Sequence, residues 1–490
     1  MLNGAWLTKS RFLAGEQCPK RLWQQCHSPL ENGNEPSPIT ETGIKVGQLA
    51  HRLFPNGAVA WTEGQTVSQA IAATSAFVKE GSTPAIFEAA LQSGKLFARV
   101  DILERGQRGA WNICEVKSST EVKDEHIDDV AFQLHVAKEA GLRVSRVEII
   151  HVNKDYVLKD QGLEPKRYFR RVDVTSKAKK RSRDIPGMIA ECLKIANKDR
   201  TPDVEPWTQC HSPYDCEFLD RCTANKPNDW IFYLPHLGEK RGELLRAKGI
   251  ESIAKIPEDV PLTEHQAIIR DVYRTGHPYI SPGLKSALRP FGPPAYYLDF
   301  ETMSPAIPLY PGTRPYERLP FQWSLHARAK NGDLQHSGFL ADGRDDPRAA
   351  FAESLLGKLA SSTEPIIVYS SYEGSTLAQL AKVLKQHRKA IKSVTARLCD
   401  LLAIMRKHVY YADFGGSYSI KDVGPVMVPN IRYDDLENVA DGGAAAWAFE
   451  RIASGRCKGE EDNLRRALEE YCQRDTLAMV EIHSQLAKIT

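Results

Sequence analysis

The clearest pattern of apolar and polar positions lies in the first half of the chain and predicts a β-hairpin. Two apolar-rich segments, residues 97–103 and 111–118, flank a polar turn that contains glycine and arginine. The charged exceptions are Asp101 in the first segment and Glu115 and Lys117 in the second. Glu115 and Lys117 are two positions apart, so their side chains project from the same face of a strand.

The rest of the first half predicts four helices and one buried strand. The first helix is expected to start within residues 7–12, with Thr8 or Ser10 as its cap. Residues 42–54, 68–79 and 124–141 have the spacing of apolar residues that is typical of amphipathic helices. Residues 144–153 are apolar and β-branched, which favours a buried strand. The hairpin is therefore expected to belong to a larger sheet with helices packed beside it.

Hydrophobic runs in the second half predict further strands and a long last helix. Residues 295–302 and 321–327 read as strands, and residues 365–373 read as a buried strand that runs into a loop and then a helix. Residues 464–486 read as a helix. Between the halves, residues 234–250 form a helical segment bounded by glycines, which suits either a helix-hairpin-helix element or a plain helical connector. These elements together predict an α/β protein.

The length of 490 residues accommodates two or three domains, each with its own core. A polar segment at residues 225–229 reads as a linker and separates the two halves. We expect one domain at residues 1–225, a helical linker at 226–290 and a second domain at 291–490.

Composition adds limits on location and partners. The net charge is only +3, which is too small to indicate that the protein as a whole attracts a strongly charged partner. Ten cysteines are too few for a disulfide scaffold of this size. The chain starts without a signal region, and it has no apolar run long enough to cross a membrane. We expect a cytoplasmic protein with no membrane association, and the sequence indicates no particular protein partner.

The charged residues of the hairpin suggest a metal-dependent phosphodiester site. Asp101 and Glu115 could hold Mg²⁺ or Mn²⁺, and Lys117 could orient or help to activate an attacking water. The alternative is an ordinary hairpin with a salt bridge. Gln133, on the following helix, could reach this site or a phosphate, or it could lie on the surface.

A basic segment follows the predicted strand 144–153. It is either a solvated surface or, with its interleaved aromatic residues, part of a path for nucleic acid. The candidate nucleic-acid-binding residues in it are Lys166, Arg167, Arg170, Arg171, Lys179, Lys180 and Arg181.

Three cysteines spaced six residues apart indicate a metal centre. Cys210, Cys216 and Cys222 lie in a polar segment, and thiolates at this density in a reducing compartment suit a soft metal or an iron–sulfur cluster. Cys18 is the natural fourth ligand. A four-iron cluster is favoured over structural Zn²⁺, because zinc sites usually have more closely paired cysteines.

The order of these motifs resembles the RecB-type PD-(D/E)xK nucleases that carry an iron–sulfur clasp. The resemblance rests on Cys18-Pro19, His51, Asp101, Glu115-Val116-Lys117 and the three later cysteines. It implies a restriction-endonuclease-like first domain in which His51, Asp101 and Glu115 bind metal. It also implies that Lys117 is catalytic, that Gln133 lies beside it, and that a 4Fe-4S cluster ties the first helix to the end of the domain.

Acidic residues of the second half suggest another metal site. Asp299 and Glu301 share one face of a strand, and two carboxylates there would repel each other without a cation. Tyr471 and Asp475 are four residues apart on the last helix and hence on one helical face. Each of these acids could also be a cap or a surface charge.

The pattern of these acids resembles the DEDD exonucleases of the RNase H-like fold, in the subclass that uses a tyrosine. By position, Asp299, Glu301 and Asp475 would hold two metal ions, and Tyr471 would orient the attacking water. The fourth acid is Glu373 or Asp400, because the asparagine that usually precedes this acid is missing. The resemblance implies a mixed sheet.

The joint architecture resembles the bacterial DUF2779 proteins, a family that has no established role. The resemblance rests on the segments 18–23, 298–302, 415–421 and 471–476. We expect a metal-dependent nuclease with two phosphodiesterase sites that acts on DNA, single-stranded or with free ends, in DNA repair or phage defence. The alternatives are a nucleic-acid-binding scaffold with degenerate sites and an RNA-processing exonuclease.

Overall fold

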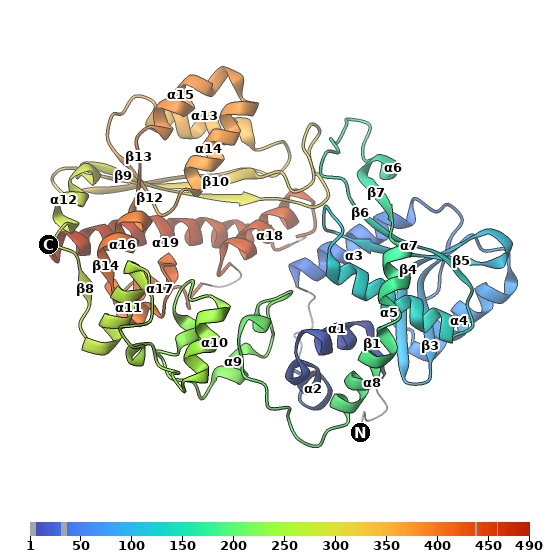
Figure 1. The fold of residues 1–490 in the computed structure, drawn as a ribbon. Coiled ribbons are helices and arrows are strands. Elements are labelled where there is room, and N and C mark those ends of the chain that lie inside the picture. Colours follow the sequence, from blue (N-terminus) through green and yellow to red (C-terminus); the bar gives the residue numbers. More distant parts are fainter. Residues whose placement is uncertain (1–5, 31–36, 437–438, 458) are drawn as a thin grey trace. The chain divides into compact units, whose positions relative to one another are not determined.

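The computed structural model is an α/β protein with mixed sheets and many helices (Figure 1). It describes residues 6–30, 37–436, 439–457 and 459–490. The chain forms two compact units: unit 1 comprises Met1–Asn225 and Ala306–Tyr316, and unit 2 comprises Lys226–Pro305 and Glu317–Thr490. The segment that the sequence predicts as a separate linker is part of unit 2.

Unit 1 contains a seven-stranded mixed sheet in the order β2-β3-β4-β5-β6-β7, with β1 paired to β4. Strands β3, β4 and β5 are antiparallel neighbours, and β5 runs parallel to β6. The predicted hairpin is the β4–β5 pair. The strands are β1 Leu7–Thr8, β2 Ala58–Val59, β3 Ala85–Ser93, β4 Leu96–Arg105, β5 Trp111–Lys117, β6 Val144–Val152 and β7 Phe169–Asp173.

Helices pack on both faces of this sheet. Phe12 of α1 and Phe132 of α5 belong to the core on one face, and Val46 and Ala50 of α3 belong to the core on the other. The α-helices are α1 Lys9–Gln17, α2 Pro19–His27, α3 Pro38–His51, α4 Val67–Glu80, α5 Asp124–Glu139, α6 Pro165–Tyr168, α7 Thr175–Arg181, α8 Ile185–Ala196 and α9 Leu219–Thr223. Short 3₁₀ helices span Gln107–Gly109 and Thr208–Cys210.

The alternation of faces along β3 changes phase at Glu88. Ile86 and Ala89 belong to the same core although they are three residues apart, whereas side chains on one face of a regular strand are an even number apart. The φ angle of Glu88 is 53°, in the left-handed region that few residues other than glycine adopt. The register pairs Phe87 with Ile102 and Ala89 with Val100. Asp101 therefore lies opposite this irregularity.

A segment from the second half of the sequence completes unit 1. Ala306 packs in the same core as Tyr168, and the Tyr168 hydroxyl donates a hydrogen bond of 3.0 Å to the Ala306 carbonyl. The Leu158 amide donates to the Thr313 carbonyl at 3.0 Å. Residues 306–316 thus supply apolar surface and backbone hydrogen bonds to a domain that ends elsewhere at Asn225.

Unit 2 contains a five-stranded mixed sheet in the order β11-β10-β9-β12-β13. Strands β11, β10 and β9 are antiparallel, and β9, β12 and β13 run parallel. A small second sheet pairs β14 with β8. The strands are β8 Tyr279–Ile280, β9 Ala295–Met303, β10 Leu319–Arg328, β11 Leu334–Leu340, β12 Ile366–Val368, β13 Leu398–Asp400 and β14 Val409–Tyr410.

The helices of unit 2 include the long helix α19, which packs along β9 and β10. On the other face, Phe351 of α13 and Leu377 of α14 form a core with Leu298 of β9. The α-helices are α10 Glu239–Ala247, α11 Glu264–Thr275, α12 Leu284–Leu288, α13 Arg348–Leu359, α14 Tyr372–Val383, α15 Arg388–Thr395, α16 Leu401–His408, α17 Ile420–Met427, α18 Gly442–Ala453 and α19 Glu461–Lys488. The 3₁₀ helices span Ile231–Tyr233, Ile253–Lys255, Arg289–Phe291, Lys385–His387 and Ala412–Phe414.

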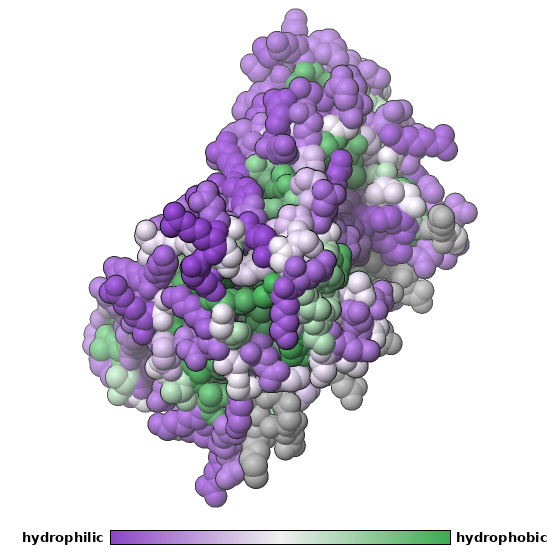
Figure 2. All heavy atoms as spheres, turned by 90° about the vertical axis from the view of Figure 1, so that its right-hand side faces the viewer, coloured by the Kyte–Doolittle hydropathy of each residue, from purple (hydrophilic) through white to green (hydrophobic). Residues whose placement is uncertain are grey.

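The segment considered for a helix-hairpin-helix contains α10, and only a three-residue 3₁₀ helix, Ile253–Lys255, follows before α11. Within the described part of the chain, no helix combines the length and the apolar character that a membrane span requires. The face drawn in Figure 2 carries mostly hydrophilic side chains with smaller hydrophobic areas between them.

Candidate functional site

A cluster of buried charges surrounds Glu115 of β5 in unit 1. Oε1 of Glu115 accepts hydrogen bonds from Nζ of Lys117 at 2.8 Å and from Nζ of Lys9 at 2.7 Å. Oε2 accepts a hydrogen bond of 2.7 Å from Nε2 of Gln133. The structure therefore brings Glu115, Lys117 and Gln133 together, and Gln133 is fully buried rather than on the surface.

Asp129 of α5 is a member of this cluster that the sequence reasoning missed. Lys117 contacts Oδ2 of Asp129 at 2.5 Å, and Gln133 donates to Oδ1 at 2.7 Å. Lys9 of α1 lies 3.5 Å from the same carboxylate. Asp129 precedes Gln133 by four residues in the predicted helix, so the helical spacing was a signal that could have found it. No local pattern pointed to Lys9.

His51 and Asp101 lie on a pocket of about 770 Å³ that Glu115 and Glu88 also line. The imidazole of His51 stacks on Phe87 with a centroid separation of 3.9 Å. Oδ2 of Asp101 accepts a hydrogen bond of 2.8 Å from the amide of Val116. Three elements, α3, β4 and β5, therefore direct the predicted metal ligands of unit 1 to one cavity.

The electrostatics of this cluster fix the charge state of its lysine. Burial and the neighbouring Glu115 raise the pKa of Asp101 to about 7. Burial acts to raise the pKa of Glu115, but Lys117 and Lys9 outweigh it and hold that pKa below its usual range. Burial acts to lower the pKa of Lys117, but Glu115 and Asp129 raise it well above the ordinary value. Lys117 is therefore an ammonium group and not a general base.

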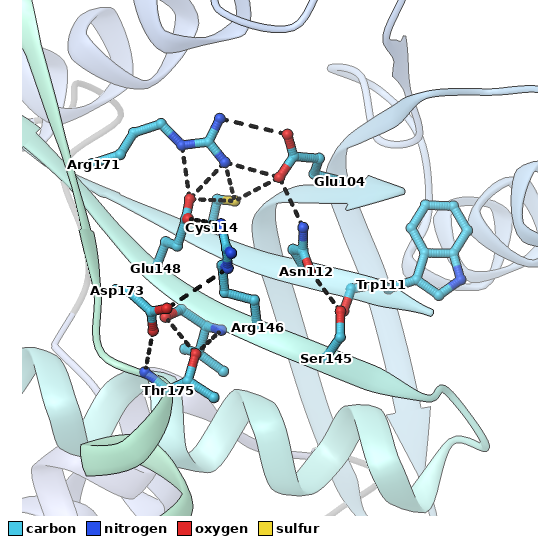
Figure 3. Close-up of polar contacts among 11 residues, drawn as sticks. Glu104, Trp111, Asn112, Cys114, Ser145, Arg146, Glu148, Arg171, Asp173 and Thr175 are labelled. Carbon is cyan, nitrogen blue, oxygen red and sulfur yellow. Dashed lines mark hydrogen bonds and ion pairs between the residues drawn. The ribbon is translucent and has the colours of Figure 1, made fainter. Parts of the chain in front are cut away.

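All four arginines of the predicted nucleic-acid path are engaged in ion pairs. The guanidinium of Arg171 lies between Glu104, at 2.8 Å, and Glu148, at 2.5 Å, beside the thiol of Cys114 (Figure 3). The other paired members are Arg167 with Glu164, Arg170 with Asp155, and Arg181 with Asp128.

The three lysines of the predicted nucleic-acid path differ from its arginines because they form no ion pairs with the described residues. Lys166, Lys179 and Lys180 are exposed and make no hydrogen bond or ion pair with the residues that the structure describes. They are the members of this segment that keep their charge available to a phosphate, whereas Arg171 is held within the protein. Arg146, 3.2 Å from Glu148, supplies a second positive charge, so Arg146, Arg171, Glu104 and Glu148 balance one another, and we assign this cluster a structural role.

The four predicted cluster ligands line one pocket of unit 1. Cys18, at the junction of α1 and α2, faces Cys210, Cys216 and Cys222 across this pocket. All four thiols are free, and Cys18 and Cys210 are more than nine-tenths buried. Nε2 of Gln24 lies 3.3 Å from Sγ of Cys222.

Polar contacts hold the cysteine-bearing segment against the first two helices. Nε2 of Gln17 donates hydrogen bonds to the carbonyls of Gln209, at 2.7 Å, and Tyr214, at 2.6 Å. Arg21 forms an ion pair of 2.7 Å with Glu217. Segments about 190 residues apart in sequence are thus joined around the four sulfur atoms.

A second group of acids lies in unit 2, around the end of β9. Ligand atoms of Asp299, Glu301 and Cys472 lie within 4.8 Å of one another. Glu373, in the first turn of α14, shares a hydrogen bond with Asp299. Asp475 of α19 belongs to the same electrostatic group and raises the pKa of both β9 acids. The four acids come from three separate elements.

Aromatic and basic residues border these acids. The Tyr433 hydroxyl donates a hydrogen bond of 2.7 Å to Oδ1 of Asp475. Nζ of Lys421 lies 4.9 Å from the ring centroid of Tyr471 and donates to the Ala440 carbonyl at 2.6 Å. The sequence reasoning gave no role to Tyr433 or Lys421, although Lys421 ends the glycine-rich segment that it singled out.

Glu373 and Asp400 have different surroundings. Glu373 is 3% exposed and hydrogen-bonds to Asp299. Asp400 is the N-cap of α16, where its Oδ1 accepts a hydrogen bond of 3.1 Å from the Ala403 amide. A capping carboxylate already has a partner and a fixed direction. The geometry therefore favours Glu373 as the fourth acid of this site.

We predict that, without bound cations, the acids of unit 2 contribute less stability to the fold as the pH rises from about 5 to about 8. Burial raises the pKa of Glu373 to about 7 and that of Asp475 to about 6, above their ordinary values of 4.5 and 3.8. A carboxyl group with a raised pKa in the folded state stabilises the fold while it is protonated, and this contribution is lost as the pH rises through that pKa.

The measurement for this prediction is the thermal midpoint in EDTA across this pH range. We expect the midpoint of the wild type to fall, relative to that of the double variant Asp299→Asn, Asp475→Asn, by an amount on the order of 2 kcal/mol, since the variant removes the repulsion. Added Mg²⁺ should restore the wild-type midpoint at the high end. A difference between the two midpoints that does not change with pH would contradict the prediction.

A comparison with protein families matches part of this chain. The model of the family described as Domain of unknown function (DUF2779) matches residues 296–419, which include Asp299, Glu301 and Glu373. This match supports the resemblance to that family. A comparison with curated proteins gave no match.

Proposed function

We propose that the protein is a metal-dependent nuclease that acts on DNA and has one phosphodiesterase site in each unit. The observation that carries the proposal is the convergence of Asp299, Glu301, Glu373 and Asp475 in unit 2. These acids come from three segments that are far apart in sequence, and three of the acids are more than nine-tenths buried. Burial of several carboxyl groups beside one another is unfavourable unless a cation or protons neutralise them.

The donor set of unit 2 suits a hard divalent cation. Carboxylate oxygens are the ligands that Mg²⁺ and Mn²⁺ prefer, and the nearby Lys421 supplies only one positive charge against four acids. A bound ion would stabilise the negative charge of the phosphate and assist the attack of water. Cys472 lies within the same ligand group, but burial and Asp299 raise its pKa well above the ordinary value, so it remains a thiol.

Tyr471 is suited to orient a water molecule by donating a hydrogen bond. Burial and the nearby Asp475 and Glu301 raise the pKa of Tyr471 above its usual range, so the hydroxyl keeps its proton at neutral pH. Lys421 contacts the face of the same ring and helps to fix its position. Tyr433 fixes the Asp475 carboxylate through its hydrogen bond.

The sheet of unit 2 supports an RNase H-like domain. Its first three strands form an antiparallel meander, and β12 and β13 then add in parallel beside β9. Asp299 and Glu301 lie on β9, at the centre of this order, and the family match begins at the same strand. A central strand with acids at its end is the arrangement that the resemblance to DEDD exonucleases implies.

The unit 1 site supports the second half of the proposal. His51, Asp101 and Glu115 line one cavity and are the residues that would hold a metal ion there. Burial lowers the pKa of His51, so its imidazole is neutral and able to act as a ligand. Lys117 is an ammonium group within 2.8 Å of Glu115 and can hold the attacking water or the phosphate by charge.

The four-cysteine pocket fits an iron–sulfur cluster that stabilises unit 1. A zinc ion with sulfur ligands at 2.3 Å would draw the sulfur atoms to about 3.8 Å from one another. The closely spaced ligand groups of the described residues include none of these four cysteines. Wider spacing favours a multinuclear cluster, which Cys18, Cys210, Cys216 and Cys222 would hold.

We predict that the protein purified without oxygen is brown and contains about four iron and four sulfide ions per chain. Cys216→Ser should lose most of the iron and unfold at a temperature several degrees lower, because the ligand links distant segments. Cys26→Ser, on α2 but outside the pocket, is the matched control and should keep the iron. A colourless protein with stoichiometric zinc would contradict the cluster.

The experiment that tests the proposed function is digestion of end-labelled DNA and RNA strands side by side with Mg²⁺, Mn²⁺ or EDTA. We expect cation-dependent release of nucleotides from DNA. Cleavage of RNA alone would make the protein an RNA-processing exonuclease. No cleavage of either strand with any of the cations would refute the proposal.

One observation favours a second candidate function for unit 1. Lys9 and Lys117 already neutralise Glu115 and Asp129, so this cluster is stable without a metal ion. Such a site could bind nucleic acid as a scaffold without cutting it. Strong, salt-dependent binding that is indifferent to cations would support this alternative, and cleavage assigned to unit 1 would exclude it.

A further inference from the structure

Unit 2 has a second pocket, of about 450 Å³, whose lining is basic and aromatic. Arg406 and Lys407 of α16 line it together with His236, His265, Tyr418 and Gly416. No acidic side chain is part of this lining. A volume of this size is typical of pockets that take small ligands or parts of larger ones.

The two cations of this pocket have no hydrogen-bond or ion-pair partner in the described part of the chain. Arg406 and Lys407 are exposed, and neither makes a hydrogen bond or an ion pair with any described residue. Most other arginines of unit 2 differ, as Arg348 pairs with Asp346 and Glu317, and Arg474 pairs with Asp435. The positive charge of α16 is therefore available to a ligand.

The other walls of the pocket are held in place by polar contacts. Nε2 of His265 lies 2.8 Å from the Tyr418 hydroxyl, which donates to the Val409 carbonyl. Burial, Arg406 and His236 lower the pKa of His265, so its imidazole is neutral at neutral pH and can donate or accept a hydrogen bond. Arg406 and Lys407 are the charged groups of the lining, and an anion that enters the pocket would be attracted by both.

The pocket is close in sequence to the acids of the same unit. Tyr418 lines the pocket, and Lys421, which contacts Tyr471, follows three residues later. Three residues span at most about 11 Å. Tyr418 and Lys421 are therefore close enough for one nucleic-acid strand to contact both.

We infer that this pocket binds a backbone phosphate of a nucleic-acid strand, a few nucleotides from the phosphate held at the acids of unit 2. The inference rests on the proposed function. Arg406 would meet the phosphate oxygens with its planar guanidinium, and Lys407 would add a point charge. The pocket thereby fixes the direction in which the strand passes the acids.

The test uses the double variant Arg406→Gln, Lys407→Gln in the full chain. Binding of a fluorescein-labelled oligothymidine strand is measured by anisotropy in EDTA, so that cleavage does not interfere. We expect the dissociation constant to rise about 10-fold or more. The slope of log affinity against log salt should fall by about 0.7 for each phosphate contact that is lost.

The matched control is Lys389→Gln, Lys392→Gln on α15, which removes the same charge from two exposed positions outside the pocket. It should bind the strand as the wild type does. Equal affinity of the wild type and the Arg406 Lys407 variant would overturn the inference. If inorganic phosphate raised the thermal midpoint of the wild type alone while both proteins bound the strand equally, the pocket would be a site for free phosphate instead.

Failure of the inference and failure of the proposed function give different results. A wild type that binds the strand through Arg406 and Lys407 but releases no nucleotides would refute the nuclease and leave the phosphate pocket in place. A protein that cuts DNA equally well with and without these two charges would refute the pocket and leave the nuclease in place.

Discussion

Replacing Asp299 with Asn in the Lys117→Ala background should reduce the cation-dependent release of nucleotides by about 10³-fold or more, the order of loss that follows removal of a catalytic group. Asp299 lies on the central strand and interacts with Glu301, Glu373 and Asp475. Asn has nearly the same shape, so the fold should be retained, while one negative ligand is lost. The release of nucleotides from end-labelled DNA and the affinity for Mg²⁺ in calorimetry are the two measurements.

Glu373 and Asp400 provide a matched pair for this experiment. Glu373→Gln should cause a loss similar to that of Asp299→Asn, since its carboxyl group belongs to the same cluster. Asp400→Asn should leave activity within about fivefold and keep the thermal midpoint, because Asn caps a helix as well as Asp does. The reverse result, with Asp400→Asn inactive and Glu373→Gln active, would contradict the assignment of the fourth acid.

Replacing Lys117 with Ala should reduce cleavage by unit 1 by about 10²-fold to 10³-fold, as expected when a charge that stabilises the transition state is removed. The variant is best made in the Asp299→Asn background, so that the remaining cleavage comes from unit 1. Lys117 contacts Glu115 and Asp129, and its loss leaves these buried acids with fewer partners. We therefore also expect a lower thermal midpoint.

Two further variants separate chemistry from stability in this experiment. Lys123→Ala removes an exposed lysine that is 3.8 Å from Glu125 and should change neither cleavage nor stability. Lys117→Arg keeps the positive charge and the ion pairs, so its thermal midpoint should stay near that of the wild type. Full cleavage by the Lys117→Ala variant in the Asp299→Asn background would show that unit 1 has no catalytic lysine at this position.

The spacing of apolar residues predicted the helices and strands whose formation depends mainly on residues close in sequence. The helix expected at residues 124–141 is α5, Asp124–Glu139, and the strand expected at 144–153 is β6, Val144–Val152. In both segments the apolar residues follow the spacing of the element, and polar residues mark where the segment begins and ends. The strand expected to start near residue 365 and to run into a loop and a helix is β12, which ends at Val368 before α14 starts at Tyr372. Glu373 therefore lies in the first turn of that helix.

Residues that depend on tertiary contacts were harder to find. Lys9 reaches Glu115 from α1, although 106 residues separate them, and Tyr433 reaches Asp475 from a segment without a motif. Neither has a local pattern, because each role depends on which elements pack together. The prediction for Arg171 shows the opposite case. A run of basic residues suggests that its charge is free to bind a phosphate, whereas Arg171 forms ion pairs with Glu104 and Glu148.

The short segment 306–316 decides how the two activities can be separated by experiment. A fragment that ends at residue 225 would lack Ala306 and Thr313, leaving Tyr168 without its carbonyl acceptor and part of the core open to water. Its loss of activity would then reflect poor folding rather than the need for a second active site. Single substitutions in the full chain, or a graft that adds residues 306–316 back through a flexible linker, are therefore the sound way to study unit 1 alone.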